Sequence, residues 1–76
     1  MTIERMTGTR IREKRMDIGL RQASLASAVG ISPSYLNLIE HNRRRIGGKL
    51  LSDLARALGV DPSNLAGGAD RDLLDQ

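Results

Sequence analysis

The 76-residue sequence contains no cysteine, no phenylalanine or tryptophan, and a single tyrosine. Without cysteine the chain can form neither disulfide bonds nor thiolate metal sites. With one aromatic ring it cannot build the stacking platform on which many single-stranded nucleic acids bind. The sequence also lacks the roughly 20 consecutive apolar residues of a membrane-spanning helix, and its first residues lack the apolar stretch of a signal peptide. We therefore expect a cytoplasmic protein with an aliphatic core.

A catalytic function is not expected from these residues. The sequence contains one histidine and no cysteine, and no metal-ligand spacing is present. Neither Gly-Gly pair belongs to a loop of the type that binds nucleotide phosphates. We therefore predict no enzymatic activity, no cofactor and no metal site.

The charge of the chain is unevenly distributed. The formal net charge is +3, yet the first 49 residues hold ten Lys and Arg side chains against four acidic ones, and the remaining residues are net negative. A positive body followed by an acidic tail is typical of a domain that meets phosphates through its N-terminal portion. A generally basic soluble domain is the alternative.

Apolar residues recur at helical spacing in several segments, which predicts an all-α fold of five helices. The first helix is expected at residues 9–18, with Ile11 and Ile18 on its inward face. The next three are expected at residues 22–29, 33–41 and 50–58, and a short fifth helix begins at Pro62 with Leu65 as its anchor. Ser-Pro and Asp-Pro pairs mark two of the starts, and glycines mark several of the ends.

The chain is short enough to hold one core only. We therefore divide it into an N-terminal arm at residues 1–8, one helical domain at residues 9–66, and an acidic tail or linker at residues 67–76. No internal repeat is present.

Two of the predicted helices are separated by a tight turn. The residues Gly-Ile-Ser at 30–32 join helix 22–29 to helix 33–41, and two short helices joined by a glycine-containing turn form a helix-turn-helix unit. The small Ala26 permits the two helix axes to cross closely. The polar loop that follows, at residues 42–48, contains three consecutive arginines.

These residues resemble the phage-repressor and Cro-like helix-turn-helix family, of the xenobiotic-response-element type, over residues 9–65. The resemblance is carried by Gln22, Leu25, Ala26, Gly30, Leu36, Ile39, Glu40, Leu54, Ala55, Leu58, Gly59 and Val60. It implies a five-helix, repressor-like domain that binds double-stranded DNA sequence-specifically and regulates transcription. It also implies a structural ion pair between Arg15 and Glu40, which lie on inward-facing edges of their helices.

The outward face of helix 33–41 is the face that a DNA major groove would meet. At about 100° per residue, Leu36 and Ile39 point to one side of the helix and a second set points away from them. With the capping serine included, the predicted base contacts are Ser32, Pro33, Ser34, Asn37, Leu38 and His41. Asn37 is suited to bidentate pairing with adenine, and Leu38 to packing on a thymine methyl group. A solvated face without contacts is the alternative.

The phosphate contacts are predicted partly from the resemblance and partly from charge. In this family the start of the second helix and the loop after the third touch phosphates, which implies such roles for Gln22, Arg43, Arg44 and Arg45. Planar guanidinium groups suit phosphate oxygens. Further candidates are Arg10, Arg21, Tyr35 and Asn42. For Tyr35, packing alone is the alternative.

One recognition helix reads only a few base pairs. We therefore predict a homodimer on a palindromic operator, with half-sites about 34 Å apart or a multiple of that. We expect the dimer contact in the region of the fourth and fifth helices, which includes Leu65. A protein-interaction module that uses the same fold is the rival function, and it would expose more apolar area. The string at residues 32–44 also resembles the N-terminal part of larger bacterial regulators that respond to short-chain acyl-CoA and sense it in a following region.

Overall fold

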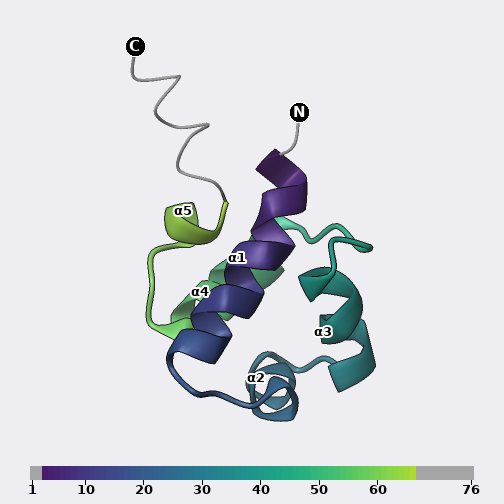
Figure 1. Ribbon diagram of the computed structural model, residues 1–76, viewed down its shortest axis with the longest axis vertical. Helices are drawn as coiled ribbons and strands as arrows, with labels where there is room; N and C mark the ends of the chain where they lie inside the picture. Colours follow the sequence, from purple (N-terminus) through teal and green to yellow (C-terminus); the bar gives the residue numbers. More distant parts are fainter. Residues whose placement is uncertain (1–2, 67–76) are drawn as a thin grey trace.

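The computed structural model describes residues 3–66, with side chains from residue 7 onward. Within this range the chain forms five α-helices and no strand, as the sequence predicts. They are α1 (Ile3–Asp17), α2 (Gln22–Val29), α3 (Pro33–Glu40), α4 (Gly48–Leu58) and α5 (Pro62–Leu65). Helix α1 packs against α3, α4 and α5, while α2 packs against α3 and α4 (Figure 1). The predicted acidic tail at residues 67–76 lies outside the described residues.

Helix α1 begins earlier than the sequence predicts. Residues 3–8, which we assigned to an N-terminal arm, belong to this helix. We expected Gly8 to end a loose segment that precedes the helix. Gly8 is instead buried, and a Cβ at this position would collide with the carbonyl oxygen of Ile39 in α3. The glycine therefore marks a close approach of two helices, not a helix boundary.

The turn between α2 and α3 has the chemistry that the sequence predicts. Gly30 adopts a left-handed backbone with φ of 76°, and the N–H groups of Gly30 and Ile31 donate to carbonyls in the last turn of α2. Glycine reaches this conformation without strain. Ser32 caps α3, because its Oγ accepts a hydrogen bond from the Tyr35 N–H at 3.0 Å, and Pro33 takes the first helical position. The end of α2 and the start of α3 are thus fixed by local interactions.

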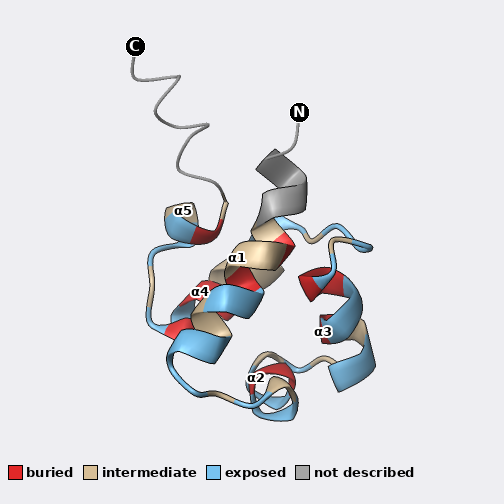
Figure 2. Ribbon diagram, in the orientation of Figure 1, coloured by how far each residue is buried: buried red, intermediate tan, exposed pale blue. Residues whose placement is uncertain are grey.

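The core is built from aliphatic side chains of all five helices (Figure 2). Its buried members are Ile11, Leu25, Ala26, Leu36, Ile39, Leu54, Ala55, Leu58 and Leu65. Leu65 anchors α5 as predicted and is 2% exposed, which assigns its side chain to the core. Ile18 was expected in the core and is 48% exposed, because α1 ends at Asp17 and Leu20 packs against the core in its place. Between residues 3 and 66, no helix combines the length and apolar character needed to cross a membrane.

Candidate nucleic-acid interface

Helix α3 buries one side and exposes the other. Leu36, Ile39 and Glu40 are buried. The exposed side is made by Ser32, Pro33, Ser34, Asn37, Leu38 and His41, which confirms the predicted orientation of the helix about its axis. Leu38 is the large apolar residue of this face and is 37% exposed. The face therefore combines hydrogen-bonding groups with an apolar side chain, which is the combination that reads base edges in DNA.

The first residue of α2 lies beside this exposed face. Gln22 lines a shallow surface depression together with residues of α3, namely Pro33, Ser34, Asn37 and Leu38. The Nε2 atom of Gln22 is 3.3 Å from Oδ1 of Asn37 and 3.2 Å from Oε1 of Glu40. Gln22 therefore connects the exposed face of α3 to a buried carboxylate behind it.

That carboxylate belongs to a bidentate ion pair between α1 and α3. Arg15 donates to Glu40 from Nε to Oε2 at 2.7 Å and from Nη2 to Oε1 at 3.0 Å, and its Nη1 donates to the carbonyl of Leu20 at 3.0 Å. The side chain of Glu40 is only 1% exposed, so its charge depends on the guanidinium for compensation. The hydrogen bond to Glu40 raises the pKa of Arg15 above its ordinary value, although burial acts in the opposite direction. The ion pair implied by the family resemblance is present.

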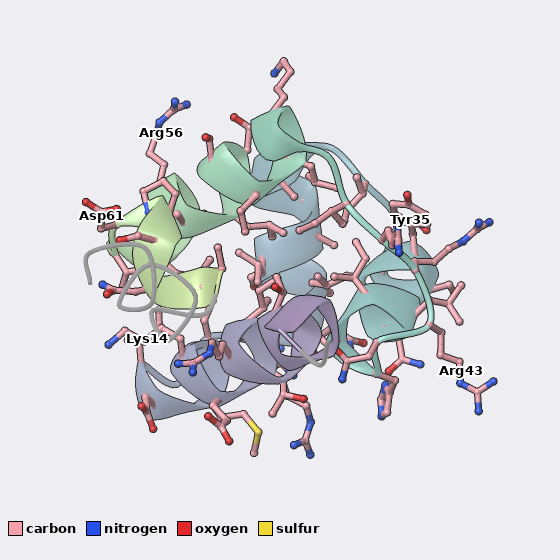
Figure 3. All side chains as sticks on the ribbon, turned by 90° about the horizontal axis from the view of Figure 1, so that it is seen from above. Lys14, Tyr35, Arg43, Arg56 and Asp61 are labelled. Carbon is pink, nitrogen blue, oxygen red and sulfur yellow. The ribbon has the colours of Figure 1, made fainter. Side chains whose placement is uncertain are left out.

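Three exposed arginines follow α3 in the loop that leads to α4. Arg43, Arg44 and Arg45 are all exposed. The guanidinium carbon of Arg44 lies 5.8 Å from the centre of the Tyr35 ring, within reach of a cation–π interaction. In Figure 3, Tyr35 and Arg43 lie on the α3 side of the molecule, and Arg56 lies on the opposite side. Arg43 therefore lies on the α3 side of the molecule, and Arg44 lies beside Tyr35 of α3.

Asn42 connects the start of this loop to α1. Its backbone is left-handed, with φ of 62°. Its Oδ1 accepts a hydrogen bond from the Gly8 N–H at 3.1 Å, and its Nδ2 donates to Oγ1 of Thr9 at 3.0 Å. We predicted a phosphate contact for Asn42 and missed Gly8 and Thr9 as its partners. No local sequence signal joins residues that lie 33 and 34 positions apart.

The two remaining predicted phosphate residues lie in different places. Arg21 is exposed at the N-cap position of α2, where its side chain makes no capping hydrogen bond. Arg10 lies on the side of α1 that faces α5, in a groove that it shares with Val60, Asn64 and Leu65. Within the described part of the chain, Nε of Arg10 is buried without a hydrogen-bond partner. The structure therefore brings Arg21 to the α2–α3 surface and separates Arg10 from it.

The arrangement of α2 and α3 defines the class of this protein. Two short helices meet at a glycine turn, the second exposes a polar face, and a buried ion pair holds that second helix against α1. This is a helix-turn-helix domain. The sequence model of the helix-turn-helix family matches residues 11–65, and the chain belongs to this family.

The chain is similar to two curated bacterial regulators. The HTH-type transcriptional regulator RamB of Mycobacterium tuberculosis is 40% identical over 67 residues, which cover 88% of this chain and 14% of that protein. The propionyl-CoA carboxylase regulator of Cereibacter sphaeroides is 38% identical over 58 residues, which cover 76% of this chain and 13% of that protein. The chain thus spans only a small part of the length of these relatives.

The fold is also similar to solved regulator structures. The clp gene regulator ClgR of Corynebacterium glutamicum matches 96% of this chain and 87% of its own, with a TM-score of 0.81 and 29% identity. The P22 c2 repressor protein, in complex with a synthetic operator, matches 79% of this chain and 91% of its own, with a TM-score of 0.74 and 33% identity. These matches confirm the predicted five-helix, repressor-like fold.

Proposed function

We propose that this chain binds double-stranded DNA sequence-specifically and forms the DNA-reading part of a transcription regulator, with α3 in the major groove. The observation that carries the proposal is the position of the exposed polar face of α3 beside the exposed arginines at 43–45. Cations bind the phosphate backbone and position a protein on the duplex, whereas polar side chains on a helix read the base edges. The operator-bound P22 c2 repressor protein shares this fold, which supports the same use of the surface here.

In this proposal the base contacts come from the exposed face of α3. Ser34 and Asn37 exchange hydrogen bonds with base edges, and Leu38 packs on a thymine methyl group. The remaining members of the face, which touch bases or the sugars beside them, are Ser32, Pro33 and His41. Nδ1 of His41 lies 2.8 Å from the carbonyl oxygen of Asn37. Because a carbonyl oxygen only accepts hydrogen bonds, Nδ1 carries the hydrogen there and Nε2 is left for the DNA.

The phosphate contacts come from both ends of the α2–α3 unit. Arg43, Arg44 and Arg45 bind one stretch of backbone, with Arg44 supported by the ring of Tyr35. Arg21 binds another at the start of α2, where no side chain caps the helix and the first amide N–H groups can meet a phosphate.

Among the residues that the sequence placed at phosphates, Gln22 is bonded to Asn37 and Glu40, and two others, Arg10 and Asn42, are not part of the proposal either. Arg10 lines the groove that faces α5. The side-chain amide of Asn42 is already bonded to Gly8 and Thr9. Arg10 therefore faces α5, and the side-chain amide of Asn42 is engaged with α1.

Selection of bound duplexes from a random pool tests this function. We expect one motif to be enriched, and its affinity to fall with salt with a slope of about −0.9 per neutralised phosphate in log–log form. An unrelated duplex should bind more weakly with a similar salt slope. A flat salt response without an enriched motif would contradict the proposal and favour the rival function, a protein-interaction module with the same fold.

We further propose that the chain acts as a homodimer on a palindromic operator, because one α3 reads too few bases for useful specificity. Half-sites about 34 Å apart, or a multiple of that, follow from the helical repeat of DNA. Sedimentation with and without the selected duplex measures the stoichiometry. Two chains per palindrome are expected, and a lasting complex of one chain per palindrome contradicts the dimer.

We propose that this domain belongs to a larger regulator that responds to short-chain acyl-CoA. Their sequences are much longer than the segment matched here, and one of them is a propionyl-CoA carboxylase regulator. We propose that effector sensing lies in a region other than these 76 residues. Duplex binding by the 76-residue chain should then be the same with and without propionyl-CoA, whereas a change in affinity would place the sensing within the chain.

A further inference from the structure

A chain of hydrogen bonds runs from the core to the exposed face of α3. It begins at Arg15, whose guanidinium donates to both carboxylate oxygens of Glu40. Gln22 lies next in the chain, with Nε2 at 3.2 Å from Oε1 of Glu40. The same Nε2 lies 3.3 Å from Oδ1 of Asn37, which is exposed.

In this series of hydrogen bonds, each residue determines whether the next residue donates or accepts. An arginine side chain only donates, and an ionised carboxylate only accepts. The atom of Gln22 that faces Glu40 must therefore be the NH2 group. Its second hydrogen then meets Asn37, and the atom of Asn37 that receives it must be the carbonyl oxygen. The buried ion pair thus determines which end of the Asn37 amide turns inward.

We propose that Gln22 is a positioning residue that fixes Asn37 with its NH2 group toward the DNA, so that Asn37 selects a base whose major-groove edge carries acceptors. This inference rests on the proposed function, since it concerns a base contact of α3. Guanine offers two acceptors in the major groove and thymine offers one, whereas cytosine offers a donor and adenine one of each. An NH2 group that approaches adenine also meets the N6 amino donor beside N7, so guanine or thymine is the base that Asn37 selects.

This assignment differs from the roles that the sequence suggested for these two residues, which were adenine pairing for Asn37 and a phosphate contact for Gln22. Bidentate pairing with adenine requires the oxygen of Asn37 to face the base beside its nitrogen, and that oxygen is directed at Gln22. A phosphate contact by Gln22 requires a free donor. Both hydrogens of its NH2 group already have acceptors, in Asn37 and Glu40.

The positioning effect depends on the burial of the ion pair. An exposed asparagine on a helix can present either end of its amide, because rotation about its last side-chain bond exchanges the two. Here the inner end of the hydrogen-bond chain is anchored by Glu40, whose side chain is 1% exposed and bonded to Arg15. Removal of the Gln22 amide should therefore free Asn37 to present its oxygen or its nitrogen to the base.

The experiment compares the base preferences of four chains on the duplex that wild type selects: wild type, Gln22→Met, Asn37→Ala and the double variant. Methionine keeps the length of the glutamine side chain and removes both donors. Asn37→Ala identifies the base pair that Asn37 contacts, as the position at which preference is lost. Thermal unfolding shows that each variant is folded, and preferences are expressed as ratios between duplexes for one protein. Asn64→Ala, an exposed asparagine on α5, is the matched control.

At the position that Asn37 contacts, wild type should prefer guanine or thymine over adenine and cytosine. Gln22→Met should reduce that preference by about 3- to 10-fold, the size of one neutral hydrogen bond, and should change nothing further when Asn37 is already alanine. If guanine is selected, 7-deazaguanine, which lacks the N7 acceptor, should bind more weakly to wild type. Asn64→Ala should leave the whole profile unchanged.

Two outcomes overturn the inference while the proposed function stands. One is an enriched adenine at the Asn37 position that survives Gln22→Met. The other is a Gln22→Met variant that loses affinity equally for all duplexes, which is the behaviour of a phosphate contact. Failure of wild type to enrich any duplex is a different result, because it overturns the proposed function together with this inference.

Discussion

The side-chain amide of Asn42 bridges the backbone of Gly8 to the loop that follows α3. Its Oδ1 accepts from the Gly8 N–H at 3.1 Å, while its Nδ2 donates to Oγ1 of Thr9. The three arginines begin at the next residue. The position of the candidate phosphate-binding loop therefore depends on a contact with α1, outside the helix-turn-helix unit itself.

Replacement of Gly8 by alanine should strongly destabilise the protein. The added Cβ would overlap the carbonyl oxygen of Ile39, and it would lie 2.6 Å from Oδ1 of Asn42. A backbone carbonyl in a helix cannot move aside cheaply, so α1 and α3 must separate. We expect a loss of about 2–3 kcal/mol in the free energy of unfolding, as for other overpacked sites, measured by urea denaturation.

Gly48→Ala is the matched control for this substitution. Gly48 is the first residue of α4, and a Cβ there would meet nothing within 4 Å. Because alanine favours helices over glycine, this variant should be unchanged or more stable by up to about 1 kcal/mol. Equal effects of the two substitutions would contradict the proposed close contact at Gly8.

Asn42 should be replaced less harmfully by glycine than by alanine. Both variants lose the hydrogen bonds to Gly8 and Thr9. Alanine must also adopt the left-handed backbone of this position, with φ of 62°, which costs about 1–2 kcal/mol for a residue with a Cβ. The free energies of unfolding should therefore rank as wild type, then Asn42→Gly, then Asn42→Ala. The same stability for both variants would show that backbone conformation has no part in the role of Asn42.

Local sequence signals predicted the parts of this fold that depend on neighbouring residues. Gly30 and Ser32-Pro33 set the ends of α2 and α3 through their own backbone and capping preferences, and helical spacing predicted which residues of α3 face outward. Ile18 was misplaced because the apolar spacing continues past the end of α1. The roles of Gly8 and Asn42 were missed because they arise from contacts between distant segments.

In the candidate site too, some features are set by neighbouring residues and others by contacts between distant segments. The exposed residues of α3 and the arginine loop follow from spacing and charge, and the structure has these residues exposed, with Arg43 on the α3 side of the molecule. The partners of Gln22 depend on how α2 lies across α3, and the position of Arg10 depends on where α5 packs against α1. The residues next to Gln22 and Arg10 in the sequence therefore could not predict either feature.

Arg15→Met should destabilise the protein by about 3–5 kcal/mol, because it leaves the buried carboxylate of Glu40 without its partner. The control is Arg12→Met, at an exposed position on the same helix, which should change stability by no more than about 0.5 kcal/mol. Chemical denaturation of both variants measures the difference. Similar values for the two would show that the ion pair does not hold α1 to α3.

The contribution of Arg15 should not depend on pH in the neutral and moderately alkaline range. The hydrogen bond to Glu40 raises the pKa of Arg15 in the folded protein. A cationic group with a raised pKa contributes its full stabilisation below the pKa of the unfolded state and loses it only as the pH rises through the folded value. Both values lie in the strongly alkaline range for arginine. The difference in stability between wild type and Arg15→Met should therefore not shrink as the pH is raised from neutral to moderately alkaline.

Arg43→Ala and Arg56→Ala should separate a phosphate contact from a general effect of charge. Both residues are exposed arginines, but Arg43 lies on the α3 side of the molecule and Arg56 on the opposite side (Figure 3). Arg43→Ala should weaken binding to the selected duplex and to unrelated duplexes by the same factor, and should reduce the magnitude of the salt slope by about 0.9. Arg56→Ala removes the same formal charge and should leave the slope unchanged. The two variants change the net charge of the protein equally. Equal salt slopes would therefore mean that Arg43 acts only through the long-range electrostatic field of the protein. The proposed contact of Arg43 with the DNA phosphate backbone would then be wrong.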